Sequence, residues 1–184
     1  MNEADIVAWD KKHDIALVHL RTQRQFTSVV RMYDPDKINE LRMGMEVIAC
    51  GCSLLHKPLM SRGHLSSLDE SAENLRMYMT SSLITFGNSG GAIFKADTLE
   101  FLGIPSRLDV ANWGFGGDPQ NFLNYFVPIH RIRDVVGDEW HYEFLFDPSV
   151  SIEESERRRK EEQDAVRKAL EERFQRERAQ SMGQ

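Results

Sequence analysis

A succession of short apolar segments separated by turn residues most constrains the fold of this chain. Segments with the apolar and β-branched content of strands recur between residues 4 and 129, and glycine, asparagine and aspartate cluster between them. Many short strands at this spacing are typical of an all-β barrel or sandwich, and no alternation of strands with helices is visible. We expect strands over residues 4–9, 15–20, 46–50, 63–68, 75–83, 92–95, 100–107 and 122–129, loops over 53–61 and 109–120, a polar hairpin over 69–74 and a short helix over 129–136 that Gly137 ends.

One turn between two of these strands has an unusual composition. Residues 86–92 read Phe-Gly-Asn-Ser-Gly-Gly-Ala and place Ser89 among turn-forming residues. Glycine permits positive φ and close approach of another backbone. Such a turn can present the Ser89 hydroxyl outward and aim the N–H groups of Gly87 and Ser89 at one point, which is the geometry that stabilises charge on a carbonyl oxygen under attack. A plain hairpin turn would use the same residues, so the motif by itself supports a nucleophile and a turn equally.

Composition and charge exclude several classes of protein. The chain has 184 residues, enough for one domain with an appendage, and its net charge of −6 argues against general nucleic-acid binding. No run of about 18 apolar residues is present, so no transmembrane span is expected. The N-terminus is acidic and lacks the apolar core of a signal peptide, which makes a cytoplasmic location the default expectation.

The two cysteines, Cys50 and Cys52, stand two residues apart in a predicted strand and should point to one face. No second cysteine or histidine pair with ligand spacing accompanies them, so we interpret them as core thiols. Neither a metal nor an organic cofactor is expected.

The composition changes sharply after Asp147-Pro148. Residues 151–184 carry 9 basic and 9 acidic side chains, so the net charge of −6 lies on residues 1–150. Ser151 and Glu154 form a capping box, which predicts a helix over 151–180. Val166, Leu170 and Phe174 give it one narrow apolar stripe. Two interpretations stay open: a solvated helix held by ion pairs four residues apart, or a helix that docks on a partner or associates with its own copy.

A series of short motifs runs in order over residues 4–136. They are Ile6-Val7-Ala8-Trp9-Asp10, Asp14-Ile15-Ala16-Leu17, Gly44-Met45-Glu46-Val47-Ile48-Ala49-Cys50-Gly51, Gly63-His64-Leu65-Ser66, the serine turn, Leu102-Gly103-Ile104-Pro105-Ser106 and Phe126-Val127-Pro128-Ile129. In this order and spacing they resemble trypsin-like serine proteases of the chymotrypsin fold, most closely the Deg-type, or high-temperature-requirement, branch. The resemblance implies a chymotrypsin-like double β-barrel over 1–147, with an incomplete first barrel, followed by a charged helical tail over 148–184.

The resemblance also implies roles for particular residues in a serine endopeptidase acting on a protein or peptide substrate. Ser89 would be the nucleophile that forms an acyl-enzyme, Asp14 a buried carboxylate that orients the catalytic imidazole, and the N–H groups of Gly87 and Ser89 the oxyanion hole. The substrate pocket would be lined by Leu83, Ile104, Pro105 and Ser106. Leu83 stands where a trypsin-type pocket needs an acid, so a small or medium apolar side chain is expected before the cut. Phe86 and Ala92 replace two prolines of the family.

The general base is missing from this pattern. The family order is His, Asp, Ser, and the histidine before Asp14 is its neighbour His13, without the family's Thr-x-x-His segment. None of His19, His56, His64, His130 and His141 matches the family's position. The chain is then truncated in its first barrel, completed by a second polypeptide, or a non-catalytic homologue that binds or scaffolds proteins. Because a serine without a base is a poor nucleophile, with residual acceleration of roughly 10³–10⁴ over water, we expect the chain alone to be nearly inert.

Overall fold

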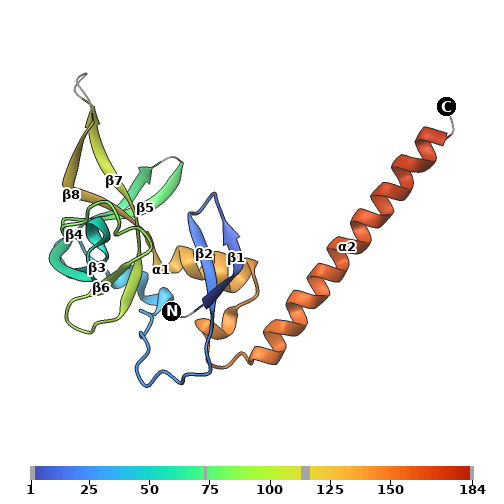
Figure 1. The fold of residues 1–184 in the computed structure, drawn as a ribbon, viewed down its shortest axis with the longest axis horizontal. Helices are drawn as coiled ribbons and strands as arrows, with labels where there is room; N and C mark the ends of the chain where they lie inside the picture. Colours follow the sequence, from blue (N-terminus) through green and yellow to red (C-terminus); the bar gives the residue numbers. More distant parts are fainter. Residues whose placement is uncertain (1–2, 73, 113–116, 183–184) are drawn as a thin grey trace. The chain divides into compact units, whose positions relative to one another are not determined.

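The computed structural model describes residues 3–72, 74–112 and 117–182 (Figure 1). The chain forms two compact units, Met1–Asp134 and Val135–Gln184, which we describe separately. The first unit holds all eight described strands and some short helical segments, and the second consists of helical segments and their connections.

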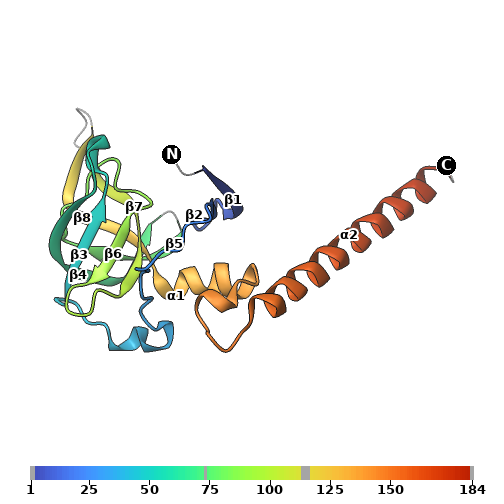
Figure 2. The same cartoon turned by 60° about the horizontal axis from the view of Figure 1, so that its bottom comes forward.

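Six strands of the first unit close into an antiparallel barrel (Figures 1 and 2). Their order around the barrel is β3-β4-β5-β8-β7-β6. The strands are β3 (Glu46–Gly51), β4 (Leu59–Ala72), β5 (Leu75–Thr80), β6 (Ala92–Lys95), β7 (Phe101–Asn112) and β8 (Gly117–Pro128). Alternate apolar side chains of these strands fill the interior, with Val47, Leu65, Met77, Ile93, Leu102 and Phe126 almost inaccessible to solvent. The all-β prediction and the chymotrypsin-like architecture are confirmed.

A separate two-stranded sheet precedes the barrel. Strands β1 (Glu3–Asp10) and β2 (Ile15–Arg21) form an antiparallel hairpin, with one register shift between Ile6 and Ala8. Among the described residues neither strand pairs with any other strand. In chain order the hairpin precedes the closed barrel, in the segment that the sequence analysis assigned to an incomplete first barrel.

One face of this hairpin is apolar and exposed. Paired residues of antiparallel strands share a face, and alternate residues of one strand do so too. The register therefore places Ala4, Ile6, Trp9, Ala16, Val18 and Leu20 together. All six are exposed, with Ile6 and Trp9 both at 67%. The hairpin thus has an apolar face like those that line a protein core, but no other segment covers this face in the part of the chain that the structure describes.

The segment between hairpin and barrel is anchored by its backbone. Tyr33 donates its N–H to the carbonyl of Phe101 at 3.1 Å, and Phe101 donates to Arg31 at 2.8 Å. The 3-10 helix η1 (Pro35–Glu40) follows, and the Asp34 side chain caps it by accepting from the Asp36 N–H. Tyr33 and Leu41 bury their side chains on either side of η1. This segment therefore packs on the barrel, although its sequence is polar and irregular.

Several strand limits differ from those predicted. Strand β4 begins at Leu59, inside the predicted loop, and runs through much of the predicted polar hairpin to Ala72. Strands β7 and β8 pair as far as Asn112↔Gly117, where a loop over 109–120 was predicted. Backbone hydrogen bonds form this ladder whatever the side chains, which is why a polar sequence concealed it. The predicted loop residues Trp113, Gly114 and Gly116 lie outside the described residues.

The short helix after the barrel also differs from the prediction. Helix α1 (Ile129–Ile132) begins as expected, and Pro128 closes β8 at its end. A π-helical segment, η3 (Arg133–Glu139), then continues past Gly137, which is buried within it. Gly137 therefore does not end the helix. Glycine ends a helix through a left-handed residue at its C-terminus, and the buried Gly137 lies inside the helical segment instead.

The second unit ends in a long charged helix, α2 (Ile152–Met182), after the 3-10 turn η4 (Glu143–Leu145). The Ser151 hydroxyl accepts from the Glu154 N–H at 3.1 Å, so the predicted cap is present. Ion pairs three and four residues apart line the helix, among them Arg157–Glu161 at 2.7 Å and Arg167–Asp164 at 2.9 Å. In the described residues, no helix is both long and apolar enough to cross a membrane.

Candidate active site

The serine turn lies between β5 and β6 and needs glycine for two reasons. Gly87 has φ +97° and Gly90 has φ +78°, in the left-handed region that favours glycine. A Cβ atom on Gly87 would lie 2.5 Å from the Cys52 carbonyl oxygen. Asn88 donates its N–H to the carbonyl of Thr85 at 3.1 Å, which closes the turn. The conformation is therefore set by the glycines that the sequence singled out.

Two residues of the segment after β3 hold the serine turn in place by hydrogen bonds. The Asn88 side chain is buried, and its Oδ1 accepts a short hydrogen bond from the Ser53 hydroxyl. Leu54 donates its N–H to the carbonyl of Phe86 at 2.7 Å. Sequence analysis missed Ser53, since no motif marks it.

The interpretation of the cysteines as core thiols is wrong. Cys50 is half-buried in β3, whereas Cys52 is exposed at the start of the 3-10 turn η2 (Ser53–Leu55). The strand ends at Gly51, so the two residues do not share a face of one strand.

Ser106 brings the serine turn and the hairpin together. The Ser89 hydroxyl donates to the Ser106 carbonyl oxygen at 3.2 Å. The Ser106 hydroxyl donates to Oδ2 of Asp14 at 2.5 Å. Gly90 donates its N–H to the carbonyl of Pro105 at 3.0 Å, so the turn is also held against β7. The sequence assigned Ser106 to the substrate pocket, and the structure shows it between Ser89 and Asp14.

Asp14 lies in the tight turn between β1 and β2, with φ +56°. Its side chain is exposed, which differs from the buried carboxylate that the family resemblance implied. The exposure has a physical cause: the hairpin pairs with no further strand among the described residues, so solvent reaches its turn.

Two backbone N–H groups of the turn are available to a ligand. Among the described residues, the N–H groups of Gly87 and Ser89 donate to no protein acceptor, whereas those of Asn88, Gly90 and Gly91 do. Donors without a protein acceptor are what an oxyanion hole requires.

The structure describes all six histidines, and none hydrogen-bonds to Ser89 or Asp14. His13, the nearest in sequence, instead contacts Asp10, with 2.6 Å between Nδ1 and Oδ2. This hydrogen bond lowers the pKa of the Asp10 carboxyl. An imidazole at hydrogen-bonding distance from the serine is therefore absent among the described residues.

The predicted pocket residues separate into two groups. Pro105 and Ser106 lie at the serine turn through the contacts given above, and the half-buried Ile104 precedes them on β7. Leu83 is 58% exposed, and its carbonyl accepts from the Ser61 hydroxyl at 2.7 Å. No hydrogen bond joins Leu83 to β7 in the described part of the chain.

A buried network of polar side chains lies just before the serine turn, and the sequence analysis did not predict it. Asn124 of β8 is fully buried and donates Nδ2 to the carbonyl of Ser82 at 2.8 Å. The hydroxyls of Thr80 and Ser82 lie 3.0 Å apart, also fully buried. These bonds fix the backbone between β5 and the serine turn.

A closed antiparallel barrel with a serine turn held against one of its strands is the arrangement of chymotrypsin-like peptidases. Comparison with known protein families agrees with this architecture. The family described as trypsin-like peptidase domain matches residues 1–104, which is more than half of the chain. The chain therefore belongs to the trypsin-like peptidase domain family.

Two similar proteins illustrate the relationship. A probable periplasmic serine endoprotease, DegP-like, of Buchnera aphidicola subsp. Schizaphis graminum is 31% identical over 121 residues, which is 62% of this chain and 24% of that protein. The chain thus spans about a quarter of the length of this curated relative. The solved structure of a variant of the HtrA-type protease AlgW with a tripeptide matches with a TM-score of 0.60 and 20% identity, covering 78% of this chain and 44% of that one. This second likeness concerns the fold.

Proposed function

We propose that this chain carries the nucleophile, the acid and the oxyanion hole of a serine endopeptidase, and that the general base comes from outside residues 1–184. The observation that carries the proposal is the double role of Ser106, whose carbonyl accepts from Ser89 and whose hydroxyl donates to Asp14. Ser89 and Asp14 are 75 positions apart in the sequence, and both hydrogen-bond to this one residue of β7.

In the proposed reaction an imidazole takes the Ser89 proton while Oγ attacks the peptide carbonyl carbon. The resulting oxyanion accepts hydrogen bonds from the N–H groups of Gly87 and Ser89. The imidazolium, stabilised by Asp14, then protonates the leaving amine, and water releases the acyl group from Ser89 by the same steps in reverse. No metal or organic cofactor enters this chemistry, and the substrate is a peptide with a small or medium apolar side chain before the cut.

The hairpin supports an external source for the base. Its apolar face exposes Ile6, Trp9, Val18 and Leu20, and covering each such side chain gains roughly 1.5–3 kcal/mol. Further strands, from a preceding segment or from a second chain, would gain this energy by packing on β1 and β2. Asp14 lies at the turn of the same hairpin, so strands that cover this sheet can bring a histidine beside it.

One observation favours a second candidate, a catalytically inactive homologue that binds or scaffolds other proteins. The Ser89 hydroxyl donates to a backbone carbonyl, which does not accept a proton, so this hydrogen bond does not activate the oxygen.

Added imidazole distinguishes the two candidates. Residues 1–184 are incubated with an activated ester of a small apolar amino acid, with and without imidazole, beside a Ser89→Ala control that subtracts solution hydrolysis. The endopeptidase proposal expects slow acylation of Ser89 that imidazole accelerates in a saturable manner. A folded chain that shows no difference from Ser89→Ala at any imidazole concentration contradicts it and supports the binding homologue.

A further inference from the structure

The first turns of α2 bury one face against residues 141–143 of the same unit. The Ser155 hydroxyl donates to Glu143 at 3.1 Å, and the Arg159 guanidinium lies 4.0 Å from the centre of the Tyr142 ring. Glu162 Oε2 lies 3.2 Å from His141 Nε2. Spacings of four and three residues put 155, 159 and 162 on one helix face. Among the described residues, the contacts of residues 141–143 with α2 extend no further along the helix than Glu162.

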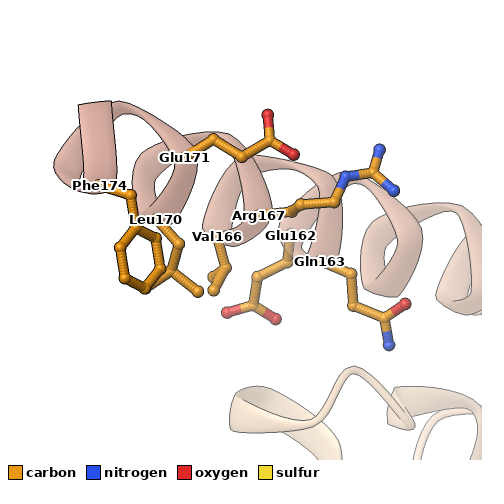
Figure 3. A pocket seen from close by; sticks show the side chains of 7 residues that line it. All are labelled: Glu162, Gln163, Val166, Arg167, Leu170, Glu171 and Phe174. Carbon is orange, nitrogen blue, oxygen red and sulfur yellow. The ribbon is translucent and has the colours of Figure 1, made fainter. Parts of the chain in front are cut away.

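The same face continues beyond that point as an apolar stripe. Val166, Leu170 and Phe174 follow at intervals of four residues, with exposed fractions of 54%, 48% and 67%. Figure 3 shows the three side chains on one side of α2, together with Glu162 and Gln163. We call Val166, Leu170 and Phe174 the α2 stripe. Toward the N-terminus of α2 the same helix face packs against residues 141–143, whereas the α2 stripe itself is exposed.

We propose that the α2 stripe pairs antiparallel with the same stripe of a second copy of this chain. In an antiparallel pair centred on Leu170, Val166 of each copy faces Phe174 of the other. Every layer then has a similar volume, because a small side chain meets a large one. A parallel pair would place Phe174 on Phe174 and Val166 on Val166, with unequal layers.

The charges beside the stripe are complementary to themselves. Arg167 and Glu171 stand one turn apart on one flank, so an antiparallel copy places Arg167 of each chain opposite Glu171 of the other. On the other flank Glu162 comes opposite Arg176 in the same register. Residues 151–184 carry 9 basic and 9 acidic side chains, so two such helices do not repel each other overall. A second copy therefore fits this surface better than a strongly acidic or basic partner.

The stripe has three apolar side chains per helix, so the pair is weak. The cost of association leaves a dissociation constant on the order of 100 µM. This inference does not rest on the peptidase chemistry, and the Ser89→Ala chain is used so that self-cleavage plays no part. Sedimentation velocity from about 10 µM to about 500 µM covers the expected transition.

The Ser89→Ala chain with an unchanged α2 stripe should have a sedimentation coefficient that rises with protein concentration. Leu170→Glu should leave the chain monomeric over the same range, since it puts two carboxylates at the centre of the pair. Gln175→Glu adds the same charge on the opposite face of α2 and should behave as the unchanged stripe does. Far-ultraviolet circular dichroism checks that both variants keep the helix. A monomer at every concentration, or association that survives Leu170→Glu, overturns the proposal; the second result would point instead to the apolar face of the β1–β2 hairpin.

Cross-linking tests the direction. In a chain with Cys50→Ser and Cys52→Ser, a mixture of Val166→Cys and Phe174→Cys chains should oxidise to the mixed disulfide at least several-fold faster than Val166→Cys chains alone. Equal or faster oxidation of Val166→Cys alone overturns the antiparallel arrangement.

Discussion

The Ser106 hydroxyl donates a hydrogen bond to Oδ2 of Asp14 over 2.5 Å, between residues 92 positions apart. This bond ties the turn of the β1–β2 hairpin to strand β7 of the barrel. It also explains why the acid and the serine turn meet at one residue, since the carbonyl of Ser106 accepts from Ser89. Ser106 thus links two segments that the sequence alone could only name separately.

Removal of this donor should loosen the hairpin. In Ser106→Ala, amide hydrogen exchange in β1 and β2 is expected to accelerate, because the main polar tie between hairpin and barrel is lost. The exposed Asp14 carboxylate returns to water, so the loss in global stability stays within about 1 kcal/mol. Hydrogen exchange read by mass spectrometry measures both regions. Ser66→Ala on β4 serves as control, and equal exchange of the hairpin in the two variants would count against the tie.

The two turn glycines should tolerate alanine unequally. At Gly90 an added Cβ atom meets nothing within 4 Å. The only penalty in Gly90→Ala is then the left-handed backbone conformation, which should lower the free energy of unfolding by about 1–2 kcal/mol. At Gly87 the same penalty is joined by an approach of 2.5 Å to the Cys52 carbonyl oxygen, a backbone atom that cannot turn aside. Gly87→Ala should therefore have the lower urea midpoint of the two. A midpoint equal to that of Gly90→Ala would show that the turn can shift away from Cys52.

The buried network beside the turn should be costly to break. Asn124→Ala leaves the buried Ser82 carbonyl without its donor, and an unsatisfied buried acceptor destabilises by about 1–3 kcal/mol. Asn39→Ala, at an exposed position, should change stability by less than about 0.5 kcal/mol. Chemical denaturation of the two variants measures the difference. Losses of the same size would mean that the amide of Asn124 does not stabilise the approach to the serine turn.

His130 should make the first unit less stable at mildly acidic pH. Burial, opposed in part by Asp134 and reinforced by Arg131 and Arg133, lowers the pKa of His130 below its usual value of 6.5. The centre of the His130 ring lies 5.6 Å from that of the Tyr78 ring, and its buried Nδ1 has no hydrogen-bond partner among the residues that the structure describes. Below pH 6.5 the unfolded chain binds a proton that the folded chain does not, so the free energy of unfolding decreases as the pH falls from about 7 toward the lowered pKa.

The variant His130→Phe isolates this effect. It should reduce the slope of stability against pH between about pH 5 and 7, since phenylalanine keeps the ring and removes the titration. Thermal or urea unfolding at several pH values gives the slope. An unchanged slope would assign the pH dependence to other groups.

Local patterns in the sequence were enough for the class of fold and for several elements. A short run of apolar residues such as 47–50, closed by Gly51, is typical of a buried strand, and Ser151 caps a helix through its contact with Glu154, three residues on. The glycines at 87 and 90 indicated a left-handed turn because no other residue adopts that backbone without cost.

Other features depended on residues far apart in the chain. The β7–β8 ladder extends to Asn112↔Gly117 through backbone bonds that polar side chains do not reveal, and Gly137 is bypassed because it is buried where a glycine in solvent would end the helix. Cys52 is exposed because β3 stops one residue before it.

The sequence by itself determined that this chain is built of many short strands, places Ser89 on a glycine-rich turn and continues into a charged, capped helix, because each of these follows from interactions between near neighbours. Only the tertiary structure decided that Ser106 lies between Ser89 and Asp14, that Ser53 holds Asn88 beneath the turn, and that no histidine of the chain reaches the serine. Those relationships come from strand register and loop packing, which join residues tens of positions apart and leave no periodic mark in the sequence.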